Sequence, residues 1–230
     1  MQHIIIVGDS WGEPNWRGPQ LPGFTEQGHT AHRLARAGYT VYNYSDSGRG
    51  NLNSWQRLDS NPPPAADWII WFHTEVIRDI TSTQRGLLRQ LLDQTADETY
   101  ARINRIRLKR EQTAGAQLIV IEGQSQRHQP QFDCYFKNYE LIPDLRATLL
   151  NQKSLPYTPL LAHISNGGQI LEQFTDSNQD KLLWIEQTKT IMDLMAASAL
   201  FPDRCHPGDL AHAQLTRRLT DLFAAKRTAI

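Results

Sequence analysis

Short apolar runs, each followed by a polar turn, recur along the first half of the chain. The run at residues 3–8 is rich in β-branched residues and predicts a strand that is buried on both faces. Beyond residue 123 the pattern weakens, and 160–164 is the next candidate strand. Between residues 8 and 123, the same apolar pattern predicts strands at 39–44, 67–73 and 116–123.

Segments with a helical repeat of apolar residues separate these strands. The pattern predicts a helix over 25–37 that ends at Gly38, and a long amphipathic helix over 84–111. The segment from 45 to 64 is predicted to be a loop, because it begins with small and turn-forming residues and ends in consecutive prolines. Weaker patterns favour helices over 142–151, 181–200 and 210–225.

The order of these elements predicts one α/β domain that spans residues 1–230. Apolar strands that alternate with helices are typical of a three-layer α/β/α fold with a mostly parallel sheet. The sequence contains no internal repeat, low-complexity tract or linker that would divide it. Ligands of such folds gather beyond the carboxyl ends of the strands. The segments GDS, SDSGRGN and HTE all follow such ends, so we expect them to meet at one edge.

Charge and composition narrow the class of protein. Lys and Arg total 24 and so do Asp and Glu, which favours neither a nucleic acid nor an anionic membrane surface as partner. No stretch approaches the roughly 20 apolar residues of a membrane helix, and the N-terminus lacks the basic region of a signal peptide. The 2 cysteines do not make a disulfide framework. We therefore expect a cytoplasmic protein.

Ser10 directly follows the first predicted strand, where its hydroxyl and backbone N–H can face one point. A serine hydroxyl is a poor nucleophile unless a base removes its proton and donors receive the developing oxyanion. Asp203 precedes His206 in a predicted loop, and this spacing lets a carboxylate orient an imidazole whose Nε2 faces a hydroxyl. In the plain structural alternative, Ser10 is a turn residue and His206 a surface histidine.

Glycines after the second predicted strand are candidate oxyanion donors. A backbone without a side chain can direct its N–H at a bound oxygen, as Gly48 and Gly50 would do here. The side chains of Asn51 and Asn53 are further candidate donors. In the alternative interpretation these are ordinary loop residues.

Three segments together resemble the motif blocks of the SGNH/GDSL hydrolase superfamily. They are IIIVGDSWG, SDSGRGN and PDRCHPG, and they occur in the order of that family. The resemblance implies a flavodoxin-like sheet in the strand order 2-1-3-4-5 and an ester hydrolase without metal or organic cofactor. It implies Ser10 as nucleophile, His206 as general base and Asp203 as its orienting partner. It also implies Gly48, or else Gly50, as the oxyanion donor beside the Ser10 N–H.

The segment after the third predicted strand departs from the family pattern. The family usually has Gly-x-Asn-Asp there, with the asparagine as oxyanion donor, whereas this chain has His73, Thr74 and Glu75. Thr74 is the first candidate to replace that donor and His73 the second, while an ionised Glu75 cannot donate. Loss of one donor costs on the order of 10²–10³ in turnover. A degenerate SGNH-like binding or structural module is therefore the alternative to an active enzyme.

Residues in the predicted loops at this edge indicate what the site would bind. Trp11, Trp16 and Trp55 suggest an aromatic wall for sugars or acyl chains, so the expected substrate is an O-acetylated sugar or a short acyl ester. Arg78 is expected to pair with Asp79 or to bind an acidic group of the substrate. The sequence does not indicate an oligomeric state.

Other candidate sites are less favoured. Glu26, His29 and His32 share a predicted helix face, but a metal site needs three or four convergent ligands and this run has no companion His/Cys cluster. Cys205 is better explained as a packed thiol than as a nucleophile. The segment GDSWGEP lacks the Lys-Ser/Thr of a phosphate-binding loop, which argues against a nucleotide binder.

Overall fold

A parallel sheet of five strands forms the middle of the molecule, in the order β2-β1-β3-β4-β5. This computed structural model describes residues 1–14, 23–74, 76–79, 88–121, 129–142 and 206–228. The order confirms the arrangement expected from the sequence. The strands are β1 (His3–Gly8), β2 (Thr40–Asn43), β3 (Trp68–Phe72), β4 (Gln117–Ile121) and β5 (Tyr139–Ile142).

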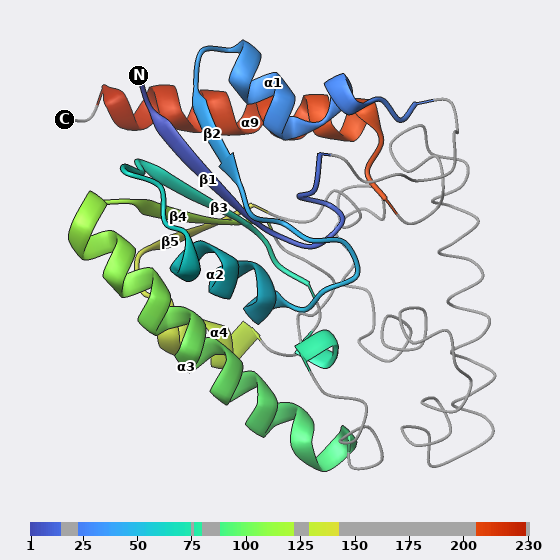
Figure 1. Cartoon of the computed structure of the whole chain (residues 1–230), viewed down its shortest axis with the longest axis vertical. Coiled ribbons are helices and arrows are strands. Elements are labelled where there is room, and N and C mark those ends of the chain that lie inside the picture. Colours follow the sequence, from blue (N-terminus) through green and yellow to red (C-terminus); the bar gives the residue numbers. More distant parts are fainter. Residues whose placement is uncertain (15–22, 75, 80–87, 122–128, 143–205, 229–230) are drawn as a thin grey trace.

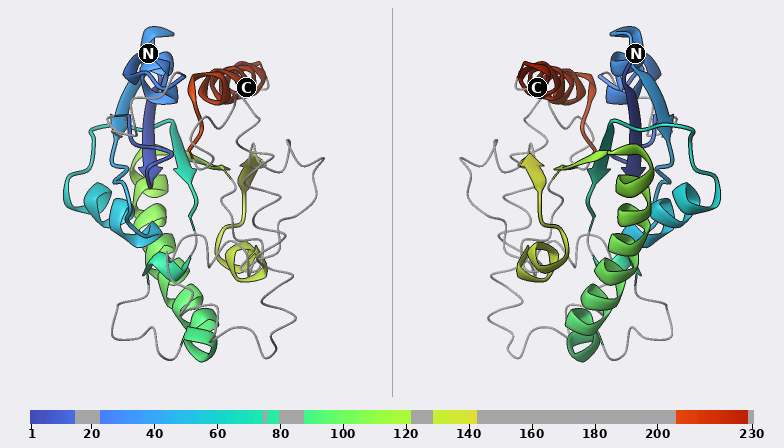
Figure 2. Two further views of the ribbon diagram at one scale, coloured as in Figure 1. Left: turned by 90° about the vertical axis from the view of Figure 1, so that its right-hand side faces the viewer. Right: turned by 90° about the vertical axis from the view of Figure 1, so that its left-hand side faces the viewer.

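Helices cover both faces of the sheet, so the three-layer α/β/α fold is also confirmed (Figures 1 and 2). One face carries α1 (Thr30–Arg36) and α9 (Asp209–Arg227). The other face carries α2 (Asn51–Ser60), α3 (Leu88–Ala114) and α4 (Gln129–Tyr135). Two short 3₁₀ helices, η1 (Glu26–Gly28) and η2 (Val76–Asp79), lie in the connections.

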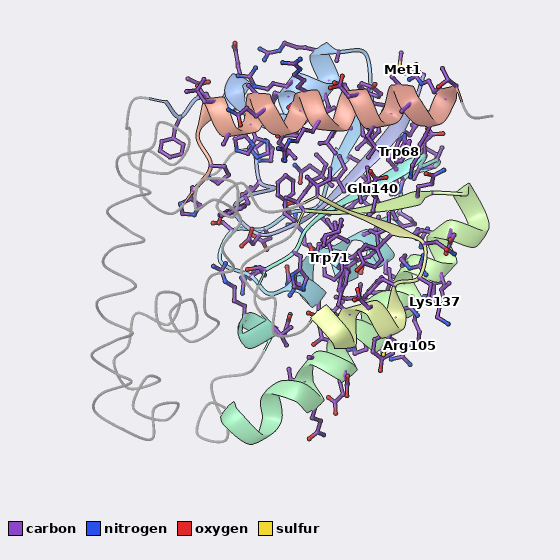
Figure 3. The ribbon with its side chains drawn as sticks, turned by 180° about the vertical axis from the view of Figure 1, so that it is seen from behind. Met1, Trp68, Trp71, Arg105, Lys137 and Glu140 are labelled. Carbon is purple, nitrogen blue, oxygen red and sulfur yellow. The ribbon has the colours of Figure 1, made fainter. Side chains whose placement is uncertain are left out.

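The alternation of side chains along each strand divides the core into two clusters. Ile4 and Ile6 pack toward α1 and α9, whereas Ile5 and Val7 pack toward α2 and α3, because successive strand residues point to opposite faces. In β3, Trp68 lies on the α9 side against Phe223, and Trp71 lies on the α2–α3 side (Figure 3). Both clusters are buried, which explains why the inner strands β1, β3 and β4 are mainly apolar.

The loop predicted over residues 45–64 contains a helix, α2, that the sequence pattern missed. Its N-cap, Gly50, makes no side-chain capping bond. The carboxylate of Asp79, from η2, instead accepts the backbone N–H groups of Asn51 and Leu52. Because the cap comes from a distant segment, no local capping signal marks the start of this helix.

Other boundaries also differ from the prediction. The helix expected over 25–37 is interrupted, since η1 ends at Gly28 and α1 begins at Thr30. The fifth strand is β5, which the pattern did not identify, while the candidate strand at 160–164 and the candidate helix at 181–200 lie outside the described residues. Within the ranges given above, no helix is both long and apolar enough to cross a membrane.

Candidate active site

Ser10 lies in a tight turn at the carboxyl end of β1. The turn runs from Asp9 to Gly12, whose N–H donates to the Asp9 carbonyl over 3.0 Å, and the Asp9 carboxylate accepts the Trp11 N–H. Gly8 precedes it with φ +148°, and a Cβ there would lie 2.6 Å from the Phe72 Cβ. Only glycine fits at this close approach of β1 and β3, the last paired position of β1 before the turn.

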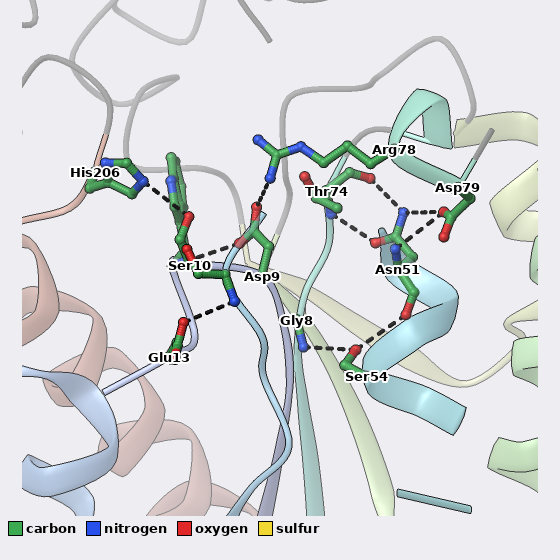
Figure 4. Close-up of polar contacts among 12 residues, drawn as sticks. Gly8, Asp9, Ser10, Glu13, Asn51, Ser54, Thr74, Arg78, Asp79 and His206 are labelled. Atoms are coloured by element: carbon green, nitrogen blue, oxygen red, sulfur yellow. Dashed lines mark hydrogen bonds and ion pairs between the residues drawn. The ribbon is translucent and has the colours of Figure 1, made fainter. Parts of the chain in front are cut away.

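His206 meets Ser10 across 196 positions of sequence, with Nε2 3.0 Å from Oγ. This contact was expected from the sequence, and Figure 4 shows His206 approaching Ser10 from the side of α9. His206 lies just before the N-cap of α9, Gly208, and is partly exposed, whereas only 7% of Ser10 is exposed. The pair therefore sits at the edge of the sheet with its hydroxyl sheltered.

The backbone N–H of Ser10 donates to no described residue. Among the described residues, the only hydrogen bond of Ser10 is the one to His206. The N–H groups of Gly48 and Gly50 also have no acceptor within this part of the chain. Gly48 lies in an exposed turn with φ +72°, and Gly50 is buried where a Cβ would lie 2.2 Å from the Asp79 carboxylate. The space beside the Gly48 backbone is therefore open to a ligand, whereas the space beside Gly50 is filled by Asp79.

A second polar cluster lies beside Ser10, built from the loops after β2 and β3. The Asn51 side chain donates to the Thr74 carbonyl and accepts the Thr74 N–H, each over 2.8 Å. Its Nδ2 also donates to Asp79. The Asn51 amide therefore connects the end of β3 to α2. Its N–H donors are engaged by these bonds, so Asn51 is not placed to serve as the oxyanion donor considered above.

The two residues expected to pair with each other, Arg78 and Asp79, have different partners. Arg78 forms an ion pair with Asp9 over 3.1 Å, and only 20% of its side chain is exposed (Figure 4). Asp79 caps α2, and burial raises its pKa to about 6 even though the N–H groups of Leu52 and Asn51 oppose that shift. The guanidinium thus steadies the residue that precedes Ser10.

The aromatic candidates lie mainly in the core. Trp55 is fully buried in α2 and packs edge-on against Trp71, so its predicted place in a rim loop is wrong. Trp11 is 8% exposed and belongs to the core cluster under α9. His73 is buried with its Nε2 2.8 Å from the Tyr100 hydroxyl, which directs that nitrogen into the core.

Two further side chains that sequence reasoning missed join the loops after β1 and β2. Asn43 donates to the Gly12 carbonyl over 2.6 Å and accepts the Ser45 N–H. Glu13 accepts the Ser47 N–H over 2.9 Å. An Asn at a strand end and a Glu after a turn are common enough that no sequence signal marks them.

Several predicted residues cannot be placed. Asp203, Cys205, Glu75 and Trp16 lie outside the described residues. In the part of the chain that is described, no group of acidic, His or Cys side chains has the convergence that a metal ion needs. His29 caps α1 and Glu26 lies 3.6 Å from His32, so that predicted helix face is used structurally.

Comparisons of the chain with protein-family models and with curated proteins found no match.

Proposed function

We propose that this protein is a serine hydrolase that cleaves an ester, with Ser10 as the nucleophile and His206 as the general base. The observation that carries the proposal is the 3.0 Å contact between Ser10 Oγ and His206 Nε2 at the carboxyl edge of a parallel sheet. A sheltered hydroxyl in contact with an imidazole is the arrangement that an activated serine needs. The Ser10 N–H beside it, which has no acceptor among the described residues, supports a site for an oxyanion.

The proposed reaction has two stages. His206 Nε2 takes the Ser10 proton as Oγ attacks the carbonyl carbon, and the proton then passes to the departing alcohol, which leaves an acyl-Ser10 ester. Water then attacks the acyl carbon while His206 takes its proton, and His206 passes that proton to Ser10 Oγ as the acid leaves. The oxyanion of each stage is stabilised by the N–H groups of Ser10 and Gly48, with Gly50 as the alternative to Gly48. Asp203 is proposed to orient His206.

The proposed substrate is an O-acetylated sugar or another short acyl ester. Thr74 is proposed to contribute a further donor from the end of β3, because its backbone is held in place by Asn51. Arg78 remains a candidate for an acidic group of the substrate, which would share the guanidinium with Asp9. An exposed free thiol, Cys134, supports the cytoplasmic location that forms part of this proposal.

Labelling with a fluorophosphonate probe tests the proposal directly. The wild type is expected to form a covalent phosphonyl adduct, and Ser10→Ala is expected to form none. Ser47→Ala is the matched control, because Ser47 is an exposed serine in the neighbouring loop whose hydroxyl the proposed chemistry does not use. Labelling that persists in Ser10→Ala would assign the nucleophile to another residue.

A binding module that keeps the Ser10–His206 arrangement without turnover is the second candidate. It is favoured by the segment after β3, which lacks asparagine, while the nearby Asn51 amide is engaged by Thr74 and Asp79. A folded wild type that neither reacts with the probe nor cleaves a broad panel of esters would favour this candidate over the hydrolase.

A further inference from the structure

Two buried histidines, His29 and His212, lie behind the Ser10 turn and take no part in the proposed chemistry. We propose that His29 is a positioning residue that holds the Ser10 turn in register with the segment that carries His206. This inference rests on the proposed function for its catalytic consequence, but its structural content stands on the contacts of the two rings.

His29 uses both of its ring nitrogens. Nδ1 accepts the Ala31 N–H over 3.1 Å and so caps α1, while Nε2 donates to the Trp11 carbonyl over 3.1 Å. These two bonds require a neutral ring with its proton on Nε2. Burial lowers the pKa of His29 to about 4, which keeps the ring in that form at neutral pH.

The Trp11 carbonyl belongs to the same turn as Ser10. Because Gly12 donates to the Asp9 carbonyl, Ser10 and Trp11 are the two central residues of a four-residue turn. Fixing the Trp11 carbonyl therefore fixes the Trp11–Gly12 peptide plane, whose N–H closes the turn onto the Asp9 carbonyl. A rotation of that plane would move Oγ relative to His206 Nε2.

His212 connects the same ring to α9. The two ring centroids are 4.1 Å apart, and His212 Nδ1 lies 3.0 Å from the Thr30 hydroxyl at the start of α1. The His212 N–H donates to the Gly208 carbonyl, in the first turn of the helix that follows His206. The two histidine rings thus connect the Ser10 turn with the first turn of α9, the helix that follows His206.

Two substitutions separate the hydrogen bond to the Trp11 carbonyl, called the bridge here, from the cap of α1. In His29→Asn, the amide oxygen takes the place of Nδ1 and keeps the cap, but the side chain is too short to reach the Trp11 carbonyl. In His29→Gln, the amide nitrogen takes the place of Nε2 and keeps the bridge, but the local cap is lost. If His29 served only to cap α1, His29→Asn would resemble the wild type more closely. If His29 positions the Ser10 turn, His29→Gln should resemble the wild type more closely.

Amide hydrogen exchange measures the turn without reference to activity. We expect exchange at the Gly12 N–H to be about tenfold faster in His29→Asn than in the wild type, since loss of one hydrogen bond is worth about that factor. His29→Gln should stay within about threefold of the wild type. The Ile119 N–H, in the central sheet, is the internal reference and should not change in either variant.

The rate of phosphonylation at saturating probe gives the catalytic consequence. It should fall about tenfold or more in His29→Asn and recover in His29→Gln, with little change in the probe concentration at half saturation. Unchanged Gly12 exchange in His29→Asn, or an equal defect in both variants, would overturn the positioning role. A wild type that is never labelled defeats the proposed function alone, because the exchange measurement still decides whether His29 holds the turn.

Discussion

Ser10 and Asn51 lie in adjacent loops at the same edge of the sheet, and their polar atoms are used in different ways. The Ser10 hydroxyl has one partner, His206, and its N–H has no acceptor among the described residues. The Asn51 amide has three hydrogen bonds, all to Thr74 or Asp79. We call these the open cluster (Ser10 and His206) and the closed cluster (Asn51, Thr74 and Asp79).

The comparison teaches where binding energy can come from. A buried polar group that already has its partners stabilises the fold but gains little from a ligand, whereas an unpaired N–H gains a hydrogen bond when an anionic oxygen arrives. Proximity to the edge of the sheet therefore does not by itself make a residue part of the chemistry. Substitutions in the open cluster should change activity, and those in the closed cluster should change stability.

The largest expected effect belongs to the open cluster. Ser10→Ala should lower turnover of an ester substrate by about 10⁴-fold or more, which is about 5 kcal/mol of transition-state stabilisation. Its free energy of unfolding should change by less than about 1 kcal/mol, because one small hydroxyl with a single partner is lost. A comparable loss of turnover in Ser47→Ala would remove the distinction between the two loops.

The next effect tests whether Thr74 belongs to both clusters. Thr74→Val removes the hydroxyl at nearly constant shape and leaves the backbone bonds to Asn51 possible. If the hydroxyl meets the oxyanion, turnover should fall by about 10²–10³-fold, or about 2–4 kcal/mol, with little change in substrate binding. Thr99→Val, at a buried threonine of α3, is the control for loss of a sheltered hydroxyl. Unchanged turnover would leave the amides of Ser10 and Gly48 as the donors.

His29, which holds the turn of the open cluster, and Asp79, in the closed cluster, should contribute opposite signs to the pH dependence of stability. The pKa of His29 is lowered to about 4, so the unfolded state binds the extra proton and stability rises by about 3 kcal/mol as pH rises from 4 to 6.5. His29 is faced by His32 and Asp209, and by His212, whose pKa burial also lowers. His212 is faced in turn by Arg33.

Asp79 contributes the other sign. Its pKa is raised to about 6, so the folded state binds the extra proton and stability falls by about 2 kcal/mol as pH rises from 4 to 6, after allowance for partial exposure. Urea unfolding across this range should give a steeper rise of stability with pH in Asp79→Asn than in the wild type. In His29→Gln the rise should be shallower. Parallel curves for all three proteins would contradict both assignments.

The smallest expected effect is that of Ser54→Ala, which should lower the free energy of unfolding and leave turnover almost unchanged. Ser54 is fully buried, accepts the Gly8 N–H and donates to the Asn51 carbonyl. Ser54→Ala leaves the Gly8 N–H without its partner and should cost about 1–2 kcal/mol of unfolding free energy. Turnover at a temperature where the variant is folded should stay within about threefold of the wild type. A large loss of turnover would place Ser54 in the open cluster.

The sequence predicted the fold well where one local pattern decides the structure. The apolar run of β1 has the same bounds in the structure as in the prediction, because a strand buried on both faces needs no polar alternation. The helix α2 was missed because its cap is Asp79, which lies far along the chain. The strand β5 was missed because it is short, at the edge of the sheet and only partly buried.

The same division holds for the candidate site. The meeting of Ser10 with His206 could be expected because each follows or precedes a predicted element at the same edge. The pairing of Arg78 with Asp9, and the burial of His73 against Tyr100, depend on three-dimensional neighbours that carry no spacing signal. Sequence reasoning thus anticipated the contact between Ser10 and His206 and missed the contacts that hold their neighbours.

The position of α9 has a consequence for how the protein is synthesised. This helix follows every other described element in the sequence, yet it packs Leu215, Leu219 and Phe223 onto the face of β1 and β3 that carries Ile4 and Trp68. During translation that face stays uncovered until the helix leaves the ribosome. The nascent chain therefore exposes an apolar surface of the kind that aggregates and that chaperones bind. His206 directly precedes that helix, so the Ser10 hydroxyl gains its contact with the imidazole only after every described element before α9 has been synthesised.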